Sequence, residues 1–179
     1  KFFDKAIVQY ETVLNLAPNH AEALNNLGSV FLEHGNPKKA IHHLSTLISK
    51  HPNYSDAFYN LGLAYNVNGN ESKAIEYFCR AASSKPDDIS LWRALGSALS
   101  PDGVSDLQYT DFYETIFLNL LNQRGTHDPY LVAPAILQFL LKNPIFAKHI
   151  AKSTEIQNNN YLCLQVIRDF GSLPLLLKL

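Results

Sequence analysis

Apolar residues recur in the first part of the chain at the three- and four-residue spacing of amphipathic helices. In residues 21–54 they form two successive stripes, which are Leu24, Leu27 and Phe31, then Ala40, Leu44 and Leu47. Between the stripes, Gly35 is suited to end one helix, Asn36 to cap the next and Pro37 to occupy its first turn. Pro52 then ends the second helix. The pattern predicts two helices joined by a tight turn.

The same helix pair recurs with a period of 34 residues, because residues 21–54 align without a gap on residues 55–88. The matched pairs are Leu24 and Phe58, Leu27 and Leu61, Gly28 and Gly62, Phe31 and Tyr65, Gly35 and Gly69, Ala40 and Ala74, Leu44 and Phe78, and Pro52 and Pro86. Residues 1–20 match the last part of an earlier unit, and residues 89–99 match the first helix of a further unit. One helix pair cannot bury its apolar face alone, so we expect the units to stack.

These motifs resemble the tetratricopeptide repeat, whose 34-residue pattern is W/L/F-x2-L-G-x2-Y/F, then A, then F/L, then P. The resemblance covers residues 1–99 and implies an all-α, right-handed superhelix, with first helices that line a concave groove for a peptide or protein partner. The small residues fit this fold. Gly28 and Gly62 let the first helix approach the second, and Ala40 and Ala74 allow the approach from the other side.

Eight residues are predicted to line the peptide-binding groove. They are Asn25, Asn26, Ser29, Tyr59, Asn60, Leu63, Asn66 and Arg93. Glu22, Glu33 and Asp56 are expected to face the same side. Asn26 and Asn60 are equivalent positions, and an asparagine amide offers both a donor and an acceptor to an extended peptide backbone. This pair resembles the asparagine ladder of the O-GlcNAc transferase repeat arm, although Ala94 interrupts it in the next unit.

The same residues bear on two other kinds of groove ligand. Repeat domains that hold chaperone C-termini use a clamp of Lys, Asn, Asn, Lys and Arg, and here Asn60 and Arg93 alone fall on clamp-like positions. One cation is too little for capture of a carboxylate, so this ligand is disfavoured. The alternative is a partner helix that packs on an apolar strip of Tyr59, Leu63 and Val67.

Residues 100–179 keep helical spacing but lose the repeat consensus, and their simplest role is a helical extension that caps the array. Ser-Pro-Asp-Gly at 100–103 predicts a break, after which Ser105 is expected to cap a helix together with Gln108. The expected helices cover 109–121, a segment from 128–129 onwards that Pro134 kinks or restarts, 145–151 and 161–170, with a polar loop at 153–160. The apolar segment 173–179 needs a covering partner, which makes self-association a further hypothesis.

The same region also resembles the helical connector of bacterial proteins in which tetratricopeptide repeats precede an S-adenosylmethionine-dependent methyltransferase domain. The similar pieces are DFYETIFLNLL, THDPYLVAPAILQFLLKNPIFAKHI and LPLLLKL. The resemblance implies that a catalytic domain would follow Leu179. The chain starts with Lys1 inside a repeat and contains no methionine, which also predicts a fragment of a longer protein.

The composition and the absence of certain motifs exclude several classes of function. The chain has 179 residues, of which 46% are hydrophobic, and a net charge of −1, so it lacks the basic footprint of a nucleic-acid-binding protein. No apolar stretch is long enough for a membrane span. Two cysteines, Cys79 and Cys163, fit packing roles in a reducing, cytoplasmic setting. His42 and His43 are adjacent without a further ligand at metal-site spacing, and no nucleotide-binding or hydrolase motif occurs. We expect no catalytic residue, metal or cofactor in this chain.

Two hypotheses for function remain open. The first is an interaction scaffold that binds a peptide or protein partner in the groove. The second is the N-terminal, substrate-recruiting part of a larger methyltransferase or glycosyltransferase, whose catalytic domain lies outside this chain. The sequence that surrounds the chain in its gene would separate them.

Overall fold

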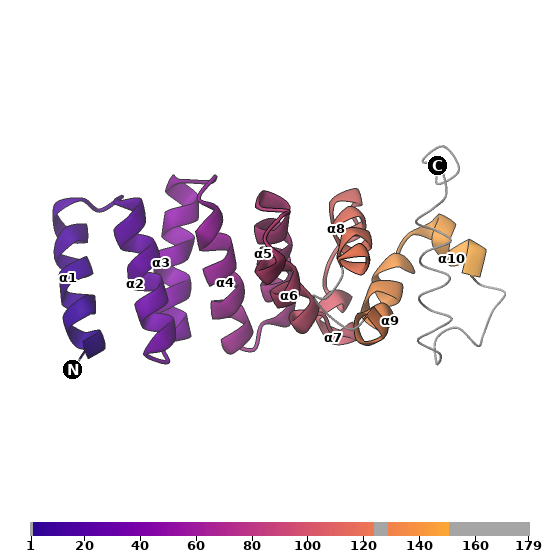
Figure 1. Ribbon diagram of the computed structural model, residues 1–179, viewed down its shortest axis with the longest axis horizontal. Coiled ribbons are helices and arrows are strands. Elements are labelled where there is room, and N and C mark those ends of the chain that lie inside the picture. The colour runs from indigo at the N-terminus through magenta and orange to yellow at the C-terminus, as the bar shows by residue number, and fades with distance from the viewer. Residues whose placement is uncertain (1, 124–128, 151–179) are drawn as a thin grey trace. The chain divides into compact units, whose positions relative to one another are not determined.

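The computed structural model describes residues 2–123 and 129–150. These ranges form α-helices, turns and loops, and contain no strand (Figure 1). The chain divides into two compact units, Lys1–Lys85 and Pro86–Leu179.

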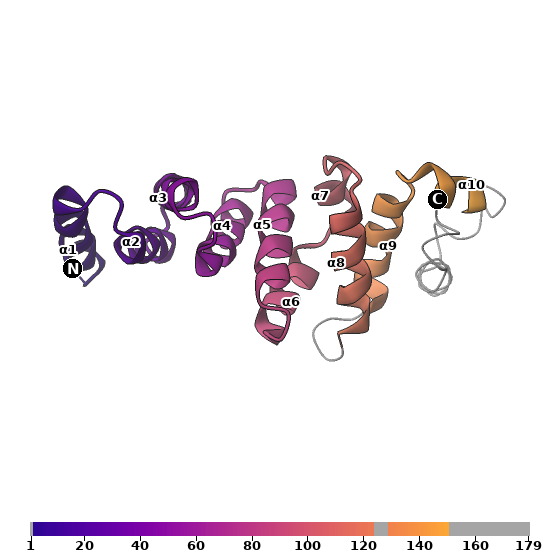
Figure 2. The same cartoon turned by 90° about the horizontal axis from the view of Figure 1, so that it is seen from above.

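The first unit contains five helices among its described residues. They are α1 (Phe2–Leu16), α2 (Ala21–Glu33), α3 (Pro37–Lys50), α4 (Ser55–Val67) and α5 (Glu71–Ser84). The predicted pairs are α2 with α3 and α4 with α5, and the members of each pair pack against each other. Helix α3 also packs against α4, and the two first helices α2 and α4 contact each other directly (Figure 2). This stacking is the arrangement that a 34-residue helical repeat predicts.

Both repeats turn from first to second helix in the same way. Gly35 and Gly69 have φ values of 74° and 76°, in the left-handed region that glycine adopts without steric cost. The asparagine after each glycine forms hydrogen bonds with both the preceding and the following helix. Asn36 donates its backbone N–H to Phe31 O at 2.8 Å, and its Oδ1 accepts the N–H of Lys39 at 3.4 Å. The corresponding distances for Asn70 are 2.9 Å to Tyr65 O and 3.0 Å from Lys73 N. The predicted glycine stop and asparagine cap are therefore confirmed at both positions.

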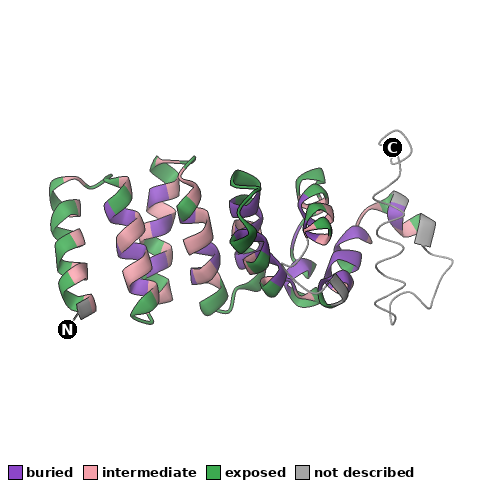
Figure 3. Cartoon of the chain, viewed as in Figure 1, coloured by how far each residue is buried: buried purple, intermediate pink, exposed green. Residues whose placement is uncertain are grey.

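The predicted close approach of the helices is also present. A Cβ atom on Gly28 would lie 2.5 Å from Leu44 Cγ, and one on Gly62 would lie 2.6 Å from the Phe78 ring. Buried residues fill the space between the helices (Figure 3). They are Leu24, Leu27, Phe31, Ala40, Leu44, Leu47, Ala57, Leu61 and Ala64. These are mainly the apolar positions of the repeat pattern.

The imidazole of His43 is half-buried on α3. The ring of His43 stacks on Phe31 with centroids 5.4 Å apart, and its other neighbours are His42, Glu11 and Lys39, whose ammonium lies 5.1 Å from the Phe31 centroid. Burial lowers the pKa of His43 below its usual 6.5, His42 and Lys39 lower it further, and Glu11 opposes them. The folded state therefore holds a neutral ring where the unfolded chain takes up a proton.

We expect the free energy of unfolding to be highest above the unfolded pKa of about 6.5 and to fall as the pH drops from there toward the lower folded pKa. His43→Gln should make the free energy of unfolding depend less on pH in this range, because it removes the imidazole that takes up a proton on unfolding. Urea unfolding of both proteins at a series of pH values measures the difference. Parallel curves for the two proteins would contradict the assignment to His43.

The second unit contains α6 (Ile89–Ala98), α7 (Pro101–Ser105), α8 (Asp111–Asn122), α9 (Pro129–Leu140) and α10 (Pro144–Ile150) among its described residues. Helix α9 packs against α7 and α8. Trp92 on α6 is buried, and its Nε1 donates a hydrogen bond to Pro86 O at 2.7 Å. The ammonium of Lys142 donates to Val104 O at 2.8 Å, to Ser105 O at 2.7 Å and to Leu107 O, and so holds the end of α7.

One local prediction for this unit is confirmed in part, and one is wrong. A break separates α6 from α7, because α6 ends at Ala98, but it is confined to Leu99 and Ser100. Residues 101–103 are already helical, because the Ser100 Oγ accepts the N–H of Gly103 at 2.9 Å and proline suits the first turn. Ser105 is the last residue of α7, and Thr110, not Ser105, caps α8. Helix α9 runs on past Pro134. The predictions for 153–160, 161–170 and 173–179 lie outside the described residues.

Candidate functional site

The first helices of the two complete repeats carry seven of the eight predicted groove residues. Asn25, Asn26 and Ser29 lie on α2, and Tyr59, Asn60, Leu63 and Asn66 lie on α4. All are half-buried except Asn66, which is exposed. We call these seven residues the first-helix face. The eighth residue, Arg93, is exposed on α6 and belongs to the second unit.

A hydrogen-bonded bridge joins α2 to α4 on this face. The amide nitrogen of Asn60 donates to Asn25 Oδ1 at 3.0 Å and to Ser29 Oγ at 3.1 Å. An asparagine amide has two N–H donors, so the bridge uses both, and Oδ1 is the atom of Asn60 that can still accept a hydrogen bond from a ligand. Asn60 therefore fixes the register of two neighbouring first helices.

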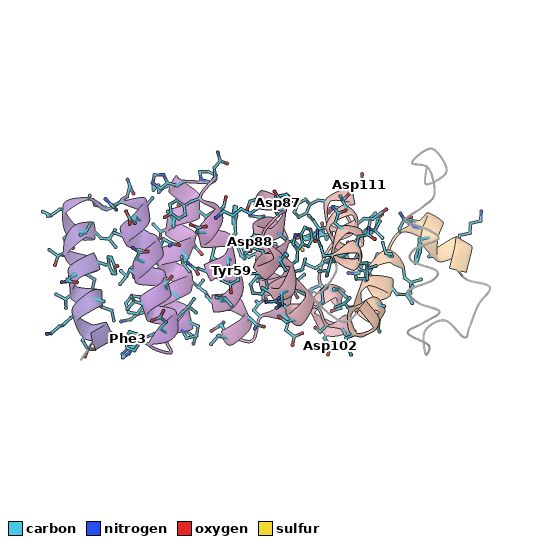
Figure 4. All side chains as sticks on the ribbon, viewed as in Figure 1. Phe3, Tyr59, Asp87, Asp88, Asp102 and Asp111 are labelled. Atoms are coloured by element: carbon cyan, nitrogen blue, oxygen red, sulfur yellow. The ribbon has the colours of Figure 1, made fainter. Side chains whose placement is uncertain are left out.

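Asn26 differs from Asn60, although the two positions are equivalent in the repeat. Asn60 bonds residues 35 and 31 positions before it, whereas the corresponding positions for the half-buried Asn26 precede Lys1. Tyr59, labelled in Figure 4, lies on α4, with its ring 6.0 Å from that of Phe78. Tyr59 and Leu63 add an aromatic and an aliphatic side chain to the first-helix face on α4.

On both α2 and α4, a carboxylate lies one helical turn before the asparagines of the first-helix face. Glu22 and Asp56 are exposed and occupy equivalent positions on α2 and α4. Asp56 Oδ1 lies 2.5 Å from the ammonium of Lys85. Burial raises the pKa of the Tyr54 hydroxyl, and Asp56 and Glu22 raise it further while Lys85 lowers it. Glu22 and Asp56 therefore act on the same phenol from two successive repeats.

Repeat alignment alone does not predict the Asn60 bridge, nor that Glu22 and Asp56 both raise the pKa of Tyr54. Alignment identifies equivalent positions, but it does not show that Asn60 reaches two residues of the preceding first helix. The available signal was the spacing, because Asn25 and Ser29 precede Asn60 by 35 and 31 residues, close to one repeat period.

The described residues offer little for metal binding or thiol chemistry. They contain no group of three or more His, Cys, Asp or Glu side chains that could hold a metal ion. Cys79 is a free, buried thiol on α5, and burial raises its pKa well above the usual value, which keeps it protonated at neutral pH. Across the ranges described, no helix has both the length and the apolar character that a bilayer crossing needs.

Two family models, both described as tetratricopeptide repeat, match residues 27–89 and residues 9–42. The two matches together span residues 9–89, which are similar to tetratricopeptide repeats. This match supports a protein-interaction role, as the sequence pattern predicted. No curated protein matches the sequence.

Solved structures with a similar fold include two of MamA. The structure described as "MamA RS-1 ArsTM double mutant" is 27% identical with a TM-score of 0.54, and the alignment covers 67% of this chain and 65% of that one. This chain therefore spans slightly less than two thirds of the length of that MamA chain. The "Crystal structure of MamA" is 20% identical with a TM-score of 0.56, and the alignment covers 96% and 92%. The tetratricopeptide matches and these likenesses confirm the predicted all-α solenoid class. They give no support to the resemblance to methyltransferase connectors.

Proposed function

We propose that the tetratricopeptide repeats bind an extended peptide segment of a protein partner on the first-helix face, and that this chain is a non-catalytic scaffold. The observation that carries the proposal is the polar bridge of Asn60 with Asn25 and Ser29 on a half-buried helix face. Asn26 is a half-buried amide at the equivalent position of the preceding repeat, on the same helix as Asn25 and Ser29. A rigid polar support and a further amide on the same helix suit recognition of a peptide backbone.

The Asn26 amide would accept a backbone N–H and donate to a backbone carbonyl of the peptide, because both groups belong to one planar side chain. Tyr59 and Leu63 would contact a side chain of the ligand. Asn60 would add an acceptor through its Oδ1. A partner helix on Tyr59, Leu63 and Val67 uses the same surface but does not need the Asn26 amide, so the two modes differ in their dependence on Asn26.

A cytoplasmic location rests on the cysteine content. Recruitment of substrate for a larger methyltransferase or glycosyltransferase has no specific observation in its favour. Self-association through 173–179 concerns residues outside the described ranges. Arg93 is exposed on α6, and its participation in ligand binding is a proposal of its own.

We expect Asn26→Ala to weaken binding of a peptide about five- to tenfold, because each hydrogen bond of this kind is worth about 1 kcal/mol. A phage-displayed library of random peptides panned on the full chain supplies the ligand, and fluorescence anisotropy with the most enriched peptide measures the affinity. Asn53→Ala is the matched control, because Asn53 is an exposed asparagine in the turn between α3 and α4.

Unchanged affinity in Asn26→Ala would overturn the proposed backbone contact, and failure to enrich any peptide would overturn peptide binding itself. Asn60→Ala is a poorer test, because it also removes two hydrogen bonds between α2 and α4. A fall in affinity there would be interpretable only beside a measurement of stability.

A further inference from the structure

Charge is unevenly divided between first and second helices in the first unit. Helices α2 and α4 carry Glu22, Glu33 and Asp56 and contain no lysine or arginine. The second helices α3 and α5 carry Lys38, Lys39, Lys50, Lys73 and Arg80, and α5 also carries Glu71 and Glu76. The charged side chains of α2 and α4 are all acidic, which favours a cationic ligand over an anionic one at these helices.

The two repeats treat their equivalent carboxylates differently. In the second repeat, Asp56 is paired with Lys85, which lies 29 residues further along the chain. The residue 29 positions after Glu22 is His51, whose Nε2 instead lies 3.0 Å from Asn19 O. Among the described residues, no lysine or arginine pairs with Glu22. The chain itself thus shows the type of group that this repeat position binds, an ammonium, and leaves the same position in the preceding repeat without one.

Glu22 is placed to act together with the peptide-binding residues. It lies three residues before Asn25 and four before Asn26 on α2, and residues at these spacings are neighbours on one side of a helix. A basic side chain on a peptide held by Asn26 would therefore find Glu22 one turn away.

We infer that the peptide partner of the first-helix face carries a lysine or arginine side chain that pairs with Glu22, and that it has no carboxylate at this point. The inference rests on the proposed function, because it specifies the chemistry of the ligand at that same site. Glu22 supplies the attraction by charge, and the Asn26 amide holds the neighbouring peptide backbone. An acidic or phosphorylated segment would meet Glu22 with like charge and would be rejected.

Panning a phage-displayed library of random peptides on the full chain tests the inference directly. We expect the selected peptides to be enriched in lysine and arginine and depleted in aspartate and glutamate. Glu22→Gln should weaken binding of the most enriched peptide about three- to fivefold, the size expected for an exposed ion pair. Panning on Glu22→Lys should reverse the preference and select acidic peptides. Glu11→Gln, at an exposed glutamate of α1, is the matched control and should leave affinity unchanged.

The outcomes separate this inference from the proposed function. Peptides whose binding depends on Asn26 but which lack basic residues, or whose affinity is the same for Glu22→Gln, would overturn the inference and leave peptide binding intact. Peptides whose binding ignores Asn26, or the absence of any enriched peptide, would overturn the proposed function and the inference with it. Circular dichroism of Glu22→Gln and Glu22→Lys checks that both variants keep the helical fold.

Discussion

Replacement of Phe139 by alanine should lower the free energy of unfolding of the second unit by about 3–5 kcal/mol. Phe139 on α9 is fully buried, and its ring lies 5.0 Å from Phe117, 5.4 Å from Tyr109 and 5.9 Å from Tyr113. Truncation would remove the ring common to these three contacts and leave a cavity among rigid aromatic neighbours that cannot collapse to fill it. Because a domain is stable by only about 5–15 kcal/mol, the loss would be a large part of the total.

The fluorescence of Trp92 during urea unfolding measures this loss. Trp92 is the single tryptophan of the chain, and it is buried on α6 in the same unit. Phe112→Ala is the control, because Phe112 on α8 is 41% exposed and its truncation should change stability by no more than about 0.5 kcal/mol. Equal shifts of the unfolding midpoint in the two variants would show that the aromatic cluster around Phe139 does not hold the unit together.

Most of the first unit could be predicted from the sequence, because its structure follows local rules that repeat. The left-handed glycine, the asparagine cap and the glycine at the helix contact each depend on a residue type at a fixed place in the period. Gly35 and Gly69, for example, have almost the same φ. When one short segment contains both the residue that ends a helix and the residue that caps the next one, the sequence is compatible with few other local structures.

The second unit was harder to predict, since no repeat constrains it. Ser100 and Pro101 are residue types of turns and also of helix N-termini, and local sequence does not decide between the two. What stabilises α7 is remote in sequence. Lys142 donates hydrogen bonds to Val104 O and Ser105 O at the end of that helix, 38 and 37 residues before it in the chain. A contact of this kind cannot be inferred from the spacing of apolar residues.

The candidate site could be predicted only in part from the sequence. The repeat register placed Asn26 and Asn60 at equivalent positions, which suggested one shared role. The structure adds that the N–H donors of Asn60 are bonded to Asn25 and Ser29 on the preceding first helix. Glu22 and Asp56 are also equivalent, and they have different surroundings, since Lys85 occurs in one repeat and His51 in the other. Differences between equivalent positions are therefore where specificity for a partner is expected.

Gly62→Val should destabilise the first unit by about 2–3 kcal/mol, because the helices there are too close for a side chain. A Cβ on Gly62 would lie 2.6 Å from Cδ1 and Cε1 of Phe78, whose ring is itself buried. To make room, α4 and α5 would have to separate, which would loosen the packing within one repeat. Gly62→Ala should cost less, because its smaller clash is partly offset by a gain in helix propensity of about 1 kcal/mol.

Hydrogen exchange of the backbone amides in α4 and α5 measures the effect locally, since a repeat array need not unfold in one step. Gly62→Val should accelerate exchange in both helices. Asn66→Val provides the control on the same helix, because Asn66 is exposed and its replacement introduces the same branched side chain without a clash. Slow exchange in Gly62→Val, matching the control, would mean that the two helices can separate without cost. The close approach that glycine permits would then not be what stabilises the repeat.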